Sequence, residues 1–282
     1  MSKGSKPTKW NANCGMSFGY ELIFSKTLEM SGVRRSFETV KVAHGGTRLY
    51  ESWFPDSGLH WPLLQNSIRN RSGAGKNWMG FVWSQGEAEA MDDLGDPFST
   101  YLGNLTYLIA RVRAEMFNSS ESGTWRCSEE IPVVVTKVGY WPSGHNAHRI
   151  RKAQQTYCDS DLMATCVSMN DTSRFYHYDA TSFLIGGHRI AKAYLYLKKI
   201  QMNFVCPQSS VEPSWGPTEI STDSSWSPTK LPTPQMKISS QDLISGPIMV
   251  GGSTISPKSA GALNENGWFK HVISAILILA VQ

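Results

Sequence analysis

The stretch Trp78–Glu87, WMGFVWSQGE, decides the fold class of this chain. Its first six residues carry no charged or hydroxyl side chain, which is typical of a central parallel strand that is buried on both faces. Polar residues follow at once, and ligand sites in α/β sheets lie just beyond the carboxyl ends of the strands. The stretch therefore predicts a buried strand that leads directly into a candidate site.

Helical and strand patterns alternate on both sides of this strand. Asp96-Pro97 is a cap and first-turn pair, and apolar residues at helical spacing follow it as far as Met116. Ile131–Val138, IPVVVTKV, is typical of a second buried strand. The other predicted elements are helices at Ser17–Met30, Asn146–Tyr157 and Thr181–Lys199, and strands at Thr39–Ala43 and Met163–Met169. This alternation predicts βαβ units and a mostly parallel sheet.

Composition limits the class of protein. The chain has 282 residues, of which 40% are hydrophobic, so it can bury a substantial core and is neither wholly disordered nor collagen-like. Its 27 basic and 23 acidic residues are scattered along the chain. Nucleic-acid binders carry a concentrated basic surface, so we expect no nucleic-acid partner.

The C-terminal part differs in composition from the rest. After a predicted domain at residues 12–200, residues 201–267 are rich in serine, proline and threonine and predict a disordered linker. Residues 268–282 contain the apolar run VISAILILAV, which is too short to span a bilayer as a helix. Small residues, a polar spacer and an apolar tail follow the order of a GPI-attachment signal. The alternatives are a frayed hydrophobic C-terminus and a weak tail anchor. The GPI signal and the tail anchor would each attach the protein to a membrane.

Other features bear on the compartment. Four Asn-x-Ser/Thr sequons begin at Asn70, Asn104, Asn118 and Asn170, and they favour a glycoprotein that is secreted or held at the cell surface. The first ten residues, MSKGSKPTKW, do not resemble a signal peptide. The five cysteines form no CxxC pair, and Cys158 with Cys166 is a plausible disulfide, although the sequence leaves the pairing open.

Polar loops follow two of the predicted strands. Gly45-Gly46-Thr47 and Gln85-Gly86-Glu87 come after strands, and His177 precedes the last predicted helix. In a parallel sheet these segments gather at the carboxyl edge. Backbone N–H groups of a glycine loop and a side-chain amide are the donors of an oxyanion hole, and histidine is the usual general base beside them. His145 and His148 have no third ligand near them in the sequence, so we expect no metal site.

Four segments carry a resemblance to a known family. They are KVAHGGTRLYESW (Lys41–Trp53), GFVWSQGEAE (Gly80–Glu89), IRKAQ (Ile150–Gln154) and HYDATSFLIGGHRIA (His177–Ala191). In this order they resemble the sialate O-acetylesterase and acetylxylan esterase family (the SASA domain) of SGNH hydrolases, over about residues 12 to 199. The resemblance implies a flavodoxin-like, three-layer α/β/α sandwich and serine-dependent removal of acetyl groups from sugars, without a metal or cofactor.

The resemblance also implies residue roles. It makes His177 the general base, and it assigns oxyanion and substrate binding to Gly45, Gly46, Gln85, Gly86 and Glu87. The family often has an acidic residue three positions before the histidine, but Arg174 stands there in this chain. Asp171 or Asp179 can replace it, and Asp171 is the predicted acid.

One part of the family pattern is missing. The family's nucleophile lies in a Gly-Gln-Ser-Asn type block after the first strand, and nothing in Met1–Asn13 resembles it. We therefore expect an acetylesterase sequence that has lost an N-terminal segment. The alternative is a non-catalytic surface protein that binds acetylated glycans, for which Trp53, Trp61, Trp83 and Trp141 would be suitable contacts.

Overall fold

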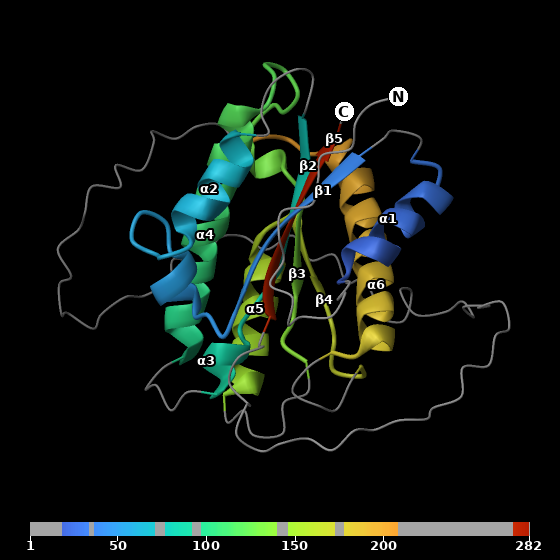
Figure 1. Cartoon of the computed structure of the whole chain (residues 1–282). Coiled ribbons are helices and arrows are strands. Elements are labelled where there is room, and N and C mark those ends of the chain that lie inside the picture. Colours follow the sequence, from blue (N-terminus) through green and yellow to red (C-terminus); the bar gives the residue numbers. More distant parts are fainter. Residues whose placement is uncertain are drawn as a thin grey trace, which may run out of the picture.

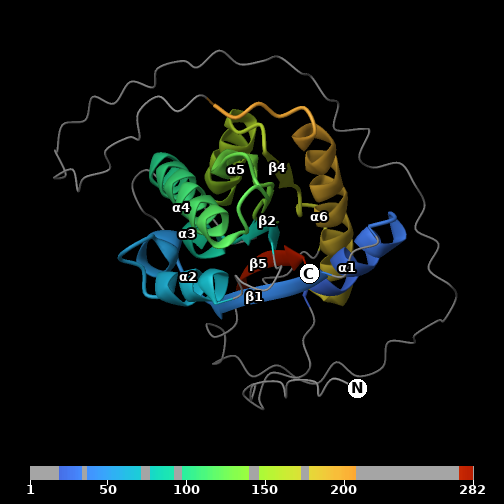
Figure 2. The ribbon, with the colours of Figure 1, turned by 90° about the horizontal axis from the view of Figure 1, so that it is seen from above.

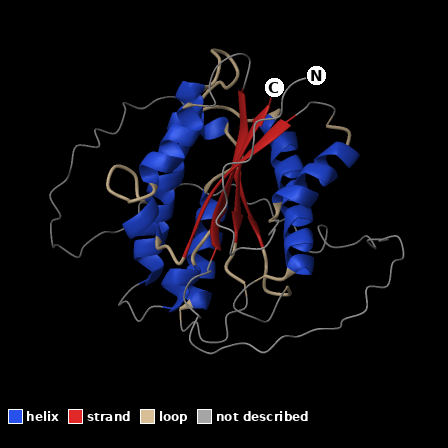
Figure 3. Cartoon of the chain, viewed as in Figure 1, coloured by secondary structure: helices blue, strands red, loops and turns tan. Residues whose placement is uncertain are grey.

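The chain folds into three layers, with a sheet between two layers of helices. The computed structural model describes residues 19–33, 37–70, 77–91, 97–139, 146–172, 178–207 and 273–281. In these ranges the sheet has the strand order β1-β5-β2-β3-β4. Helices α2, α4 and α5 lie on one side of it and α1 and α6 on the other (Figures 1 and 3). The predicted α/β/α fold is confirmed.

The parallel part of the sheet lies where the sequence predicts it. It consists of β2 (Asn77–Ser84), β3 (Val133–Thr136) and β4 (Ala164–Val167). Strands β2 and β3 are in register from Phe81 with Val133 to Ser84 with Thr136, and β3 pairs with β4 in the same direction. Parallel strands need a crossover between them, and α4 and α5 fill these positions. The carboxyl ends of β2 and β3 therefore meet at one edge.

The apolar C-terminal run forms a strand in the sheet. Strand β5 (Ile273–Val281) lies between β1 (Phe37–Gly45) and β2 and is antiparallel to both. Figure 2 shows β5 between these two strands from above. Because β5 opposes both neighbours, β1 runs in the same direction as β2. The sequence predicts a separate hydrophobic segment at 268–282, but the nine residues of β5, too few for a membrane helix, have an ordinary length for a strand.

The helices follow the predicted periodicity. Helix α4 begins at Pro97 as expected, and the side chain of Asp179 caps α6 by accepting a hydrogen bond from the Ser182 N–H at 2.7 Å. The helix bounds are α1 Glu21–Met30, α2 Trp61–Arg69, α3 Glu87–Met91, α4 Pro97–Ser119, α5 Ala147–Ser160 and α6 Ala180–Gln201, with a π-helical turn at Leu49–Trp53 and a 3₁₀ turn at Ser128–Glu130. None of the helices in the described ranges is both long enough and apolar enough to cross a membrane.

The core has two halves, one on each face of the sheet. Phe81 and Trp83 of β2 pack in the cluster that contains the apolar faces of α2, α4 and α5. Val82, between them in sequence, packs in the second cluster with α1 and α6. This alternation follows from the period of two in a strand. The WMGFVW segment is therefore buried on both faces, as the sequence predicts.

Two disulfides fasten the helical layers. Cys158 at the end of α5 is bonded to Cys166 of β4, which confirms the pairing suggested by the sequence. Cys127 is bonded to Cys206, which joins the segment before β3 to the residues after α6. Cys14 and residues 208–272, which include most of the predicted linker, lie outside the described residues.

Candidate functional site

The ends of β1 and β2 bring two predicted loops together. Gly45 is the last residue of β1 and Gly46-Thr47 follow it, while Gln85-Gly86-Glu87 follows β2. The side-chain amide of Gln85 donates a hydrogen bond to the Thr47 carbonyl at 2.9 Å. Residues that are 38 positions apart in the sequence are thus in direct contact at the carboxyl edge of the sheet, as predicted.

Side chains around the glycine loop hold its shape. Gly46 has a φ of 68°, a conformation that glycine adopts at little cost. Thr47 donates its hydroxyl to the His44 carbonyl at 3.0 Å and accepts a hydrogen bond from the Trp53 indole at 2.8 Å. The rings of His44 and His60 stack beside the loop, with centroids 4.3 Å apart. The loop therefore has a defined conformation before any ligand binds.

Gln85 is buried at the centre of this contact. Its Nε2 donates to the Thr47 carbonyl and, at 2.6 Å, to a carboxylate oxygen of Glu89. The other oxygen of Glu89 accepts a hydrogen bond from the Leu49 N–H. An amide nitrogen has two hydrogens, so both are engaged here. In this arrangement Gln85 ties the glycine loop to α3.

Gly86 is a position where no side chain fits. Its φ of 136° is a conformation that other residues rarely adopt. A Cβ placed here would lie 2.7 Å from Val138 Cγ2 and 2.8 Å from Ile150 Cγ2. The turn between β2 and α3 therefore packs directly against the residues after β3 and against α5.

Glu87 is a buried carboxyl group at the same edge. Only 7% of its surface is exposed, and burial raises its pKa from 4.5 to about 7. Its Oε2 has no hydrogen-bond partner in the described part of the chain, and neither does the hydroxyl of buried Tyr20. Burial raises the pKa of Tyr20 further above its usual range, and the Glu87 charge adds to the effect. A carboxyl group with an unpaired buried oxygen is typical of a functional position.

The structure describes the predicted acid but not the predicted base. His177 lies outside the described residues. Asp171 is exposed and forms two hydrogen bonds of 2.6 Å with the Arg189 guanidinium, which lowers the pKa of this carboxyl. Asp179 is the α6 cap. Both aspartates thus have structural partners, and their catalytic roles stay predictions.

Three side chains to which the sequence analysis assigned no role complete the site. The Tyr101 hydroxyl donates to the Gln85 carbonyl at 2.8 Å, Gln154 donates to the same carbonyl at 2.9 Å, and Glu89 accepts from the Gln85 amide. The i, i+4 spacing of Gln85 and Glu89 is the signal that the sequence offered for that pair. Tyr101 lies on the apolar face of its helix, so the pattern alone marks it as a core residue.

The tryptophans proposed as glycan contacts are mostly core residues. The exposed fractions of Trp53, Trp61 and Trp83 are 0%, 3% and 0%. Trp141 lies outside the described residues. Side chains buried to this degree cannot stack on a sugar, so the sequence-based interpretation of these three residues is wrong.

Comparisons with known proteins identify a family and a weak structural likeness. A model of the carbohydrate esterase family of sialic acid-specific acetylesterases (SASA) matches residues 3–196. A search of curated proteins found no match. An X-ray structure of a protein from Arabidopsis thaliana is similar with 22% identity and a TM-score of 0.42, over 54% of this chain and 58% of that protein.

Proposed function

The chain belongs to the carbohydrate esterase family of sialic acid-specific acetylesterases, and from that membership we propose that it removes O-acetyl groups from sugars by acyl transfer to a serine. The observation that carries the proposal is the contact between the glycine loop and the Gln85-Gly86-Glu87 turn. It joins two of the motifs that mark the family at the edge of the sheet where α/β enzymes bind their substrates.

The proposed mechanism has two half-reactions. A serine Oγ attacks the acetyl carbonyl carbon while His177 takes the hydroxyl proton, and the carbonyl oxygen becomes an oxyanion. The sugar oxygen leaves with the proton from His177. Water then attacks the acetyl-serine with His177 again as the base; the bond to serine Oγ breaks as Oγ takes this proton from His177, and acetate leaves. We do not assign the nucleophile to Ser84, because this serine at the end of β2 is buried among core residues.

Oxyanion stabilisation is assigned to the glycine loop. The residues on either side of Gly45 and Gly46 are held, the His44 carbonyl by the Thr47 hydroxyl and the Thr47 carbonyl by the Gln85 amide. Donors that are fixed before the reaction are the most effective ones. Both hydrogens of the Gln85 amide are already bonded. We therefore propose that the main part of Gln85 is to hold the loop, with Gly86 giving the turn its shape.

We propose Glu87 as the carboxyl group that orients His177. Burial raises the pKa of Tyr178, the residue that follows His177 in the chain, and the nearby Tyr20 and then Glu87 add to the effect. One Glu87 oxygen has no partner among the described residues, whereas Asp171 is paired with Arg189. A buried carboxylate that accepts a hydrogen bond from the imidazole would fix its tautomer and stabilise its cation. For these reasons we favour Glu87 over Asp171.

The direct test measures acetate release. The protein, produced from its natural start so that any N-terminal nucleophile block is included, is incubated with O-acetylated sialic acid and with acetylated xylan, beside the variants His177→Ala and Glu87→Gln. The proposal expects release by the wild type that falls at least about a thousandfold in His177→Ala. Release that is unchanged in His177→Ala would overturn the mechanism.

A non-catalytic glycan-binding function is the second candidate. It predicts binding of O-acetylated sugars, measured by calorimetry, without release of acetate. Absence of both binding and release would overturn both functions. The burial of Trp53, Trp61 and Trp83 removes three of the four aromatic contacts proposed for this alternative.

We further propose that the protein is a secreted or cell-surface glycoprotein. Two disulfides support this, because disulfides persist mainly in oxidising compartments. Attachment to a membrane through the C-terminal segment stays a prediction. A decrease in mass after glycosidase treatment of the natural protein, and its recovery from the medium or the cell surface, would support the assignment; an unmodified intracellular protein would contradict it.

A further inference from the structure

Helix α5 presents one fully buried polar side chain to the site, that of Gln154. Its exposed fraction is 0%. Nε2 donates to the Gln85 carbonyl at 2.9 Å, and Oε1 accepts a hydrogen bond from the Val138 N–H at 3.0 Å. The Tyr101 hydroxyl and the Thr136 carbonyl lie at 3.4 Å from Nε2. The amide therefore contacts the residues that follow both β2 and β3.

These contacts begin where the sheet ladder stops. The last paired residues of β2 and β3 are Ser84 and Thr136. Beyond them, Gln85 offers a carbonyl and Val138 an N–H. Buried backbone groups need partners, and a side-chain amide supplies one donor and one acceptor, as a peptide group does. Gln154 thus takes the place of a strand partner where the two strands separate.

We propose that Gln154 is a positioning residue, which fixes the Gln85–Gly86 turn relative to β3 and so sets the geometry of the catalytic edge. The effect of Gln154 on the position of the turn does not depend on any reaction, whereas its effect on catalysis rests on the proposed function. Only glutamine has both the amide and the length for these two bonds. Methionine has a similar shape without the amide, and asparagine has the amide on a shorter side chain.

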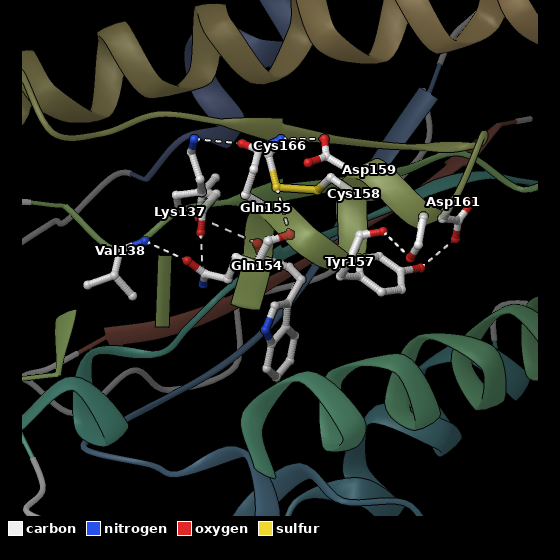
Figure 4. The surroundings of a disulfide bond; sticks show 12 residues. Lys137, Val138, Gln154, Gln155, Tyr157, Cys158, Asp159, Asp161 and Cys166 are labelled. Atoms are coloured by element: carbon white, nitrogen blue, oxygen red, sulfur yellow. Dashed lines mark hydrogen bonds between the residues drawn. A yellow bond between two sulfur atoms is a disulfide. The ribbon is translucent and has the colours of Figure 1, made fainter. Parts of the chain in front are cut away.

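Helix α5 is itself held firmly against the sheet. Ile150, one turn before Gln154, fills the space next to Gly86. Cys158, one turn after Gln154, is bonded to Cys166 of β4. Figure 4 shows the Cys158–Cys166 bond beside Gln154, whose amide faces Val138. A side chain on a helix fixed at both sides can define the position of the groups that it bonds.

Gln155 provides a matched control on the same helix. Its amide bonds only to charged side chains, accepting from Lys137 Nζ at 2.8 Å and donating to Asp159 at 2.8 Å (Figure 4). The change Gln155→Met therefore removes the same amide from the neighbouring position without touching the Gln85 carbonyl or the Val138 N–H.

The experiment compares Gln154→Met with Gln155→Met in the full chain. Hydrogen exchange of the peptides that cover residues 84–91 and 137–139 reports on the turn without any need for activity. We expect exchange there to accelerate roughly tenfold or more in Gln154→Met and to stay unchanged in Gln155→Met, while exchange in α6 changes in neither. For acetate release we expect kcat to fall roughly tenfold or more in Gln154→Met, with KM within about twofold.

The outcomes separate this inference from the proposed function. Equal exchange in the two variants would overturn the inference, whatever the activity. Faster exchange in Gln154→Met together with a wild type that releases no acetate would support the positioning of the turn and refute the esterase. If Gln154→Met does not fold, Gln154→Asn replaces it; this amide reaches one partner at most, so protection of both peptides at the wild-type level would overturn the inference.

Discussion

Replacing Glu87 by glutamine should stabilise the protein at neutral pH while it lowers activity. The variant keeps the size and shape of the side chain but removes the charge from a buried position. Burial of an ionised carboxyl is costly, and the raised pKa measures that cost. Residues that serve a reaction often reduce stability in this way.

The magnitude follows from the pKa of Glu87. It is about 7 in the folded protein against an ordinary value of 4.5, and each unit corresponds to about 1.4 kcal/mol. Below pH 4.5 the Glu87 carboxyl is neutral in both the folded and the unfolded protein, so burying it lowers the free energy of unfolding least there. As the pH rises towards 7 the unfolded chain loses its proton first, and the free energy of unfolding falls by about 3 kcal/mol. This decrease is absent in Glu87→Gln.

The assay is urea unfolding of both proteins at a series of pH values. We expect the two free energies of unfolding to lie closest at acid pH and to separate until Glu87→Gln is about 3 kcal/mol more stable near pH 8. Glu121→Gln, at an exposed carboxyl after α4, is the control and should show no such trend. A Glu87→Gln variant that is less stable than the wild type at pH 8, or a difference that does not vary with pH, would refute the reasoning.

Three further predictions concern the surroundings of the site and the core. Gly86→Ala should lower the free energy of unfolding by about 2–4 kcal/mol, because φ at this residue is positive and Val138 and Ile150 fill the space. Gly103→Ala, on an open face of α4, should raise the free energy of unfolding by about 0.5–1 kcal/mol. Urea unfolding that ranks the two variants the other way would contradict this prediction. Arg113→Met should lower the free energy of unfolding by about 3–5 kcal/mol in the same assay, since it leaves the Asp161 carboxylate without its buried partner. A decrease below about 1 kcal/mol would show that the pair is not coupled. Burial, and next the nearby His44, lower the pKa of His60. The contribution of neutral His60 to stability should therefore be fully present above about pH 6.5 and be lost as the pH falls below that value. The melting temperature of His60→Phe should depend less on pH than that of the wild type, and equal pH dependence in both proteins would contradict this prediction.

The sequence predicted those parts of the fold that depend on local pattern. The WMGFVW strand, the helix that begins at Pro97 and the convergence of Gly46 and Gln85 all follow from periodicity, capping and the direction of parallel strands. Each rests on residues near one another in the chain or on a rule that holds for any parallel sheet.

The parts that the sequence did not predict depend on contacts between distant residues. Nothing local in Ile273–Val281 indicates that it pairs with β1 and β2, because an apolar run fits a strand, a tail or an anchor equally well. The bonds from Tyr101 and Gln154 to the Gln85 carbonyl depend on the direction of side chains across three elements, and periodicity does not determine this. Because periodicity does not determine which way a side chain points across elements, the sequence suggests Trp53 as a glycan contact although this residue lies in the core.

The central claim is that a histidine at position 177 activates a serine for attack on an ester. Labelling with a fluorophosphonate, which reacts with activated serines, tests this claim without any assumption about the sugar. In the protein produced from its natural start, we expect one labelled serine in the wild type, identified by peptide mapping, and loss of labelling in His177→Ala while Gln155→Met is labelled like the wild type. No labelling of the folded wild type, or labelling that does not depend on His177, would contradict the account.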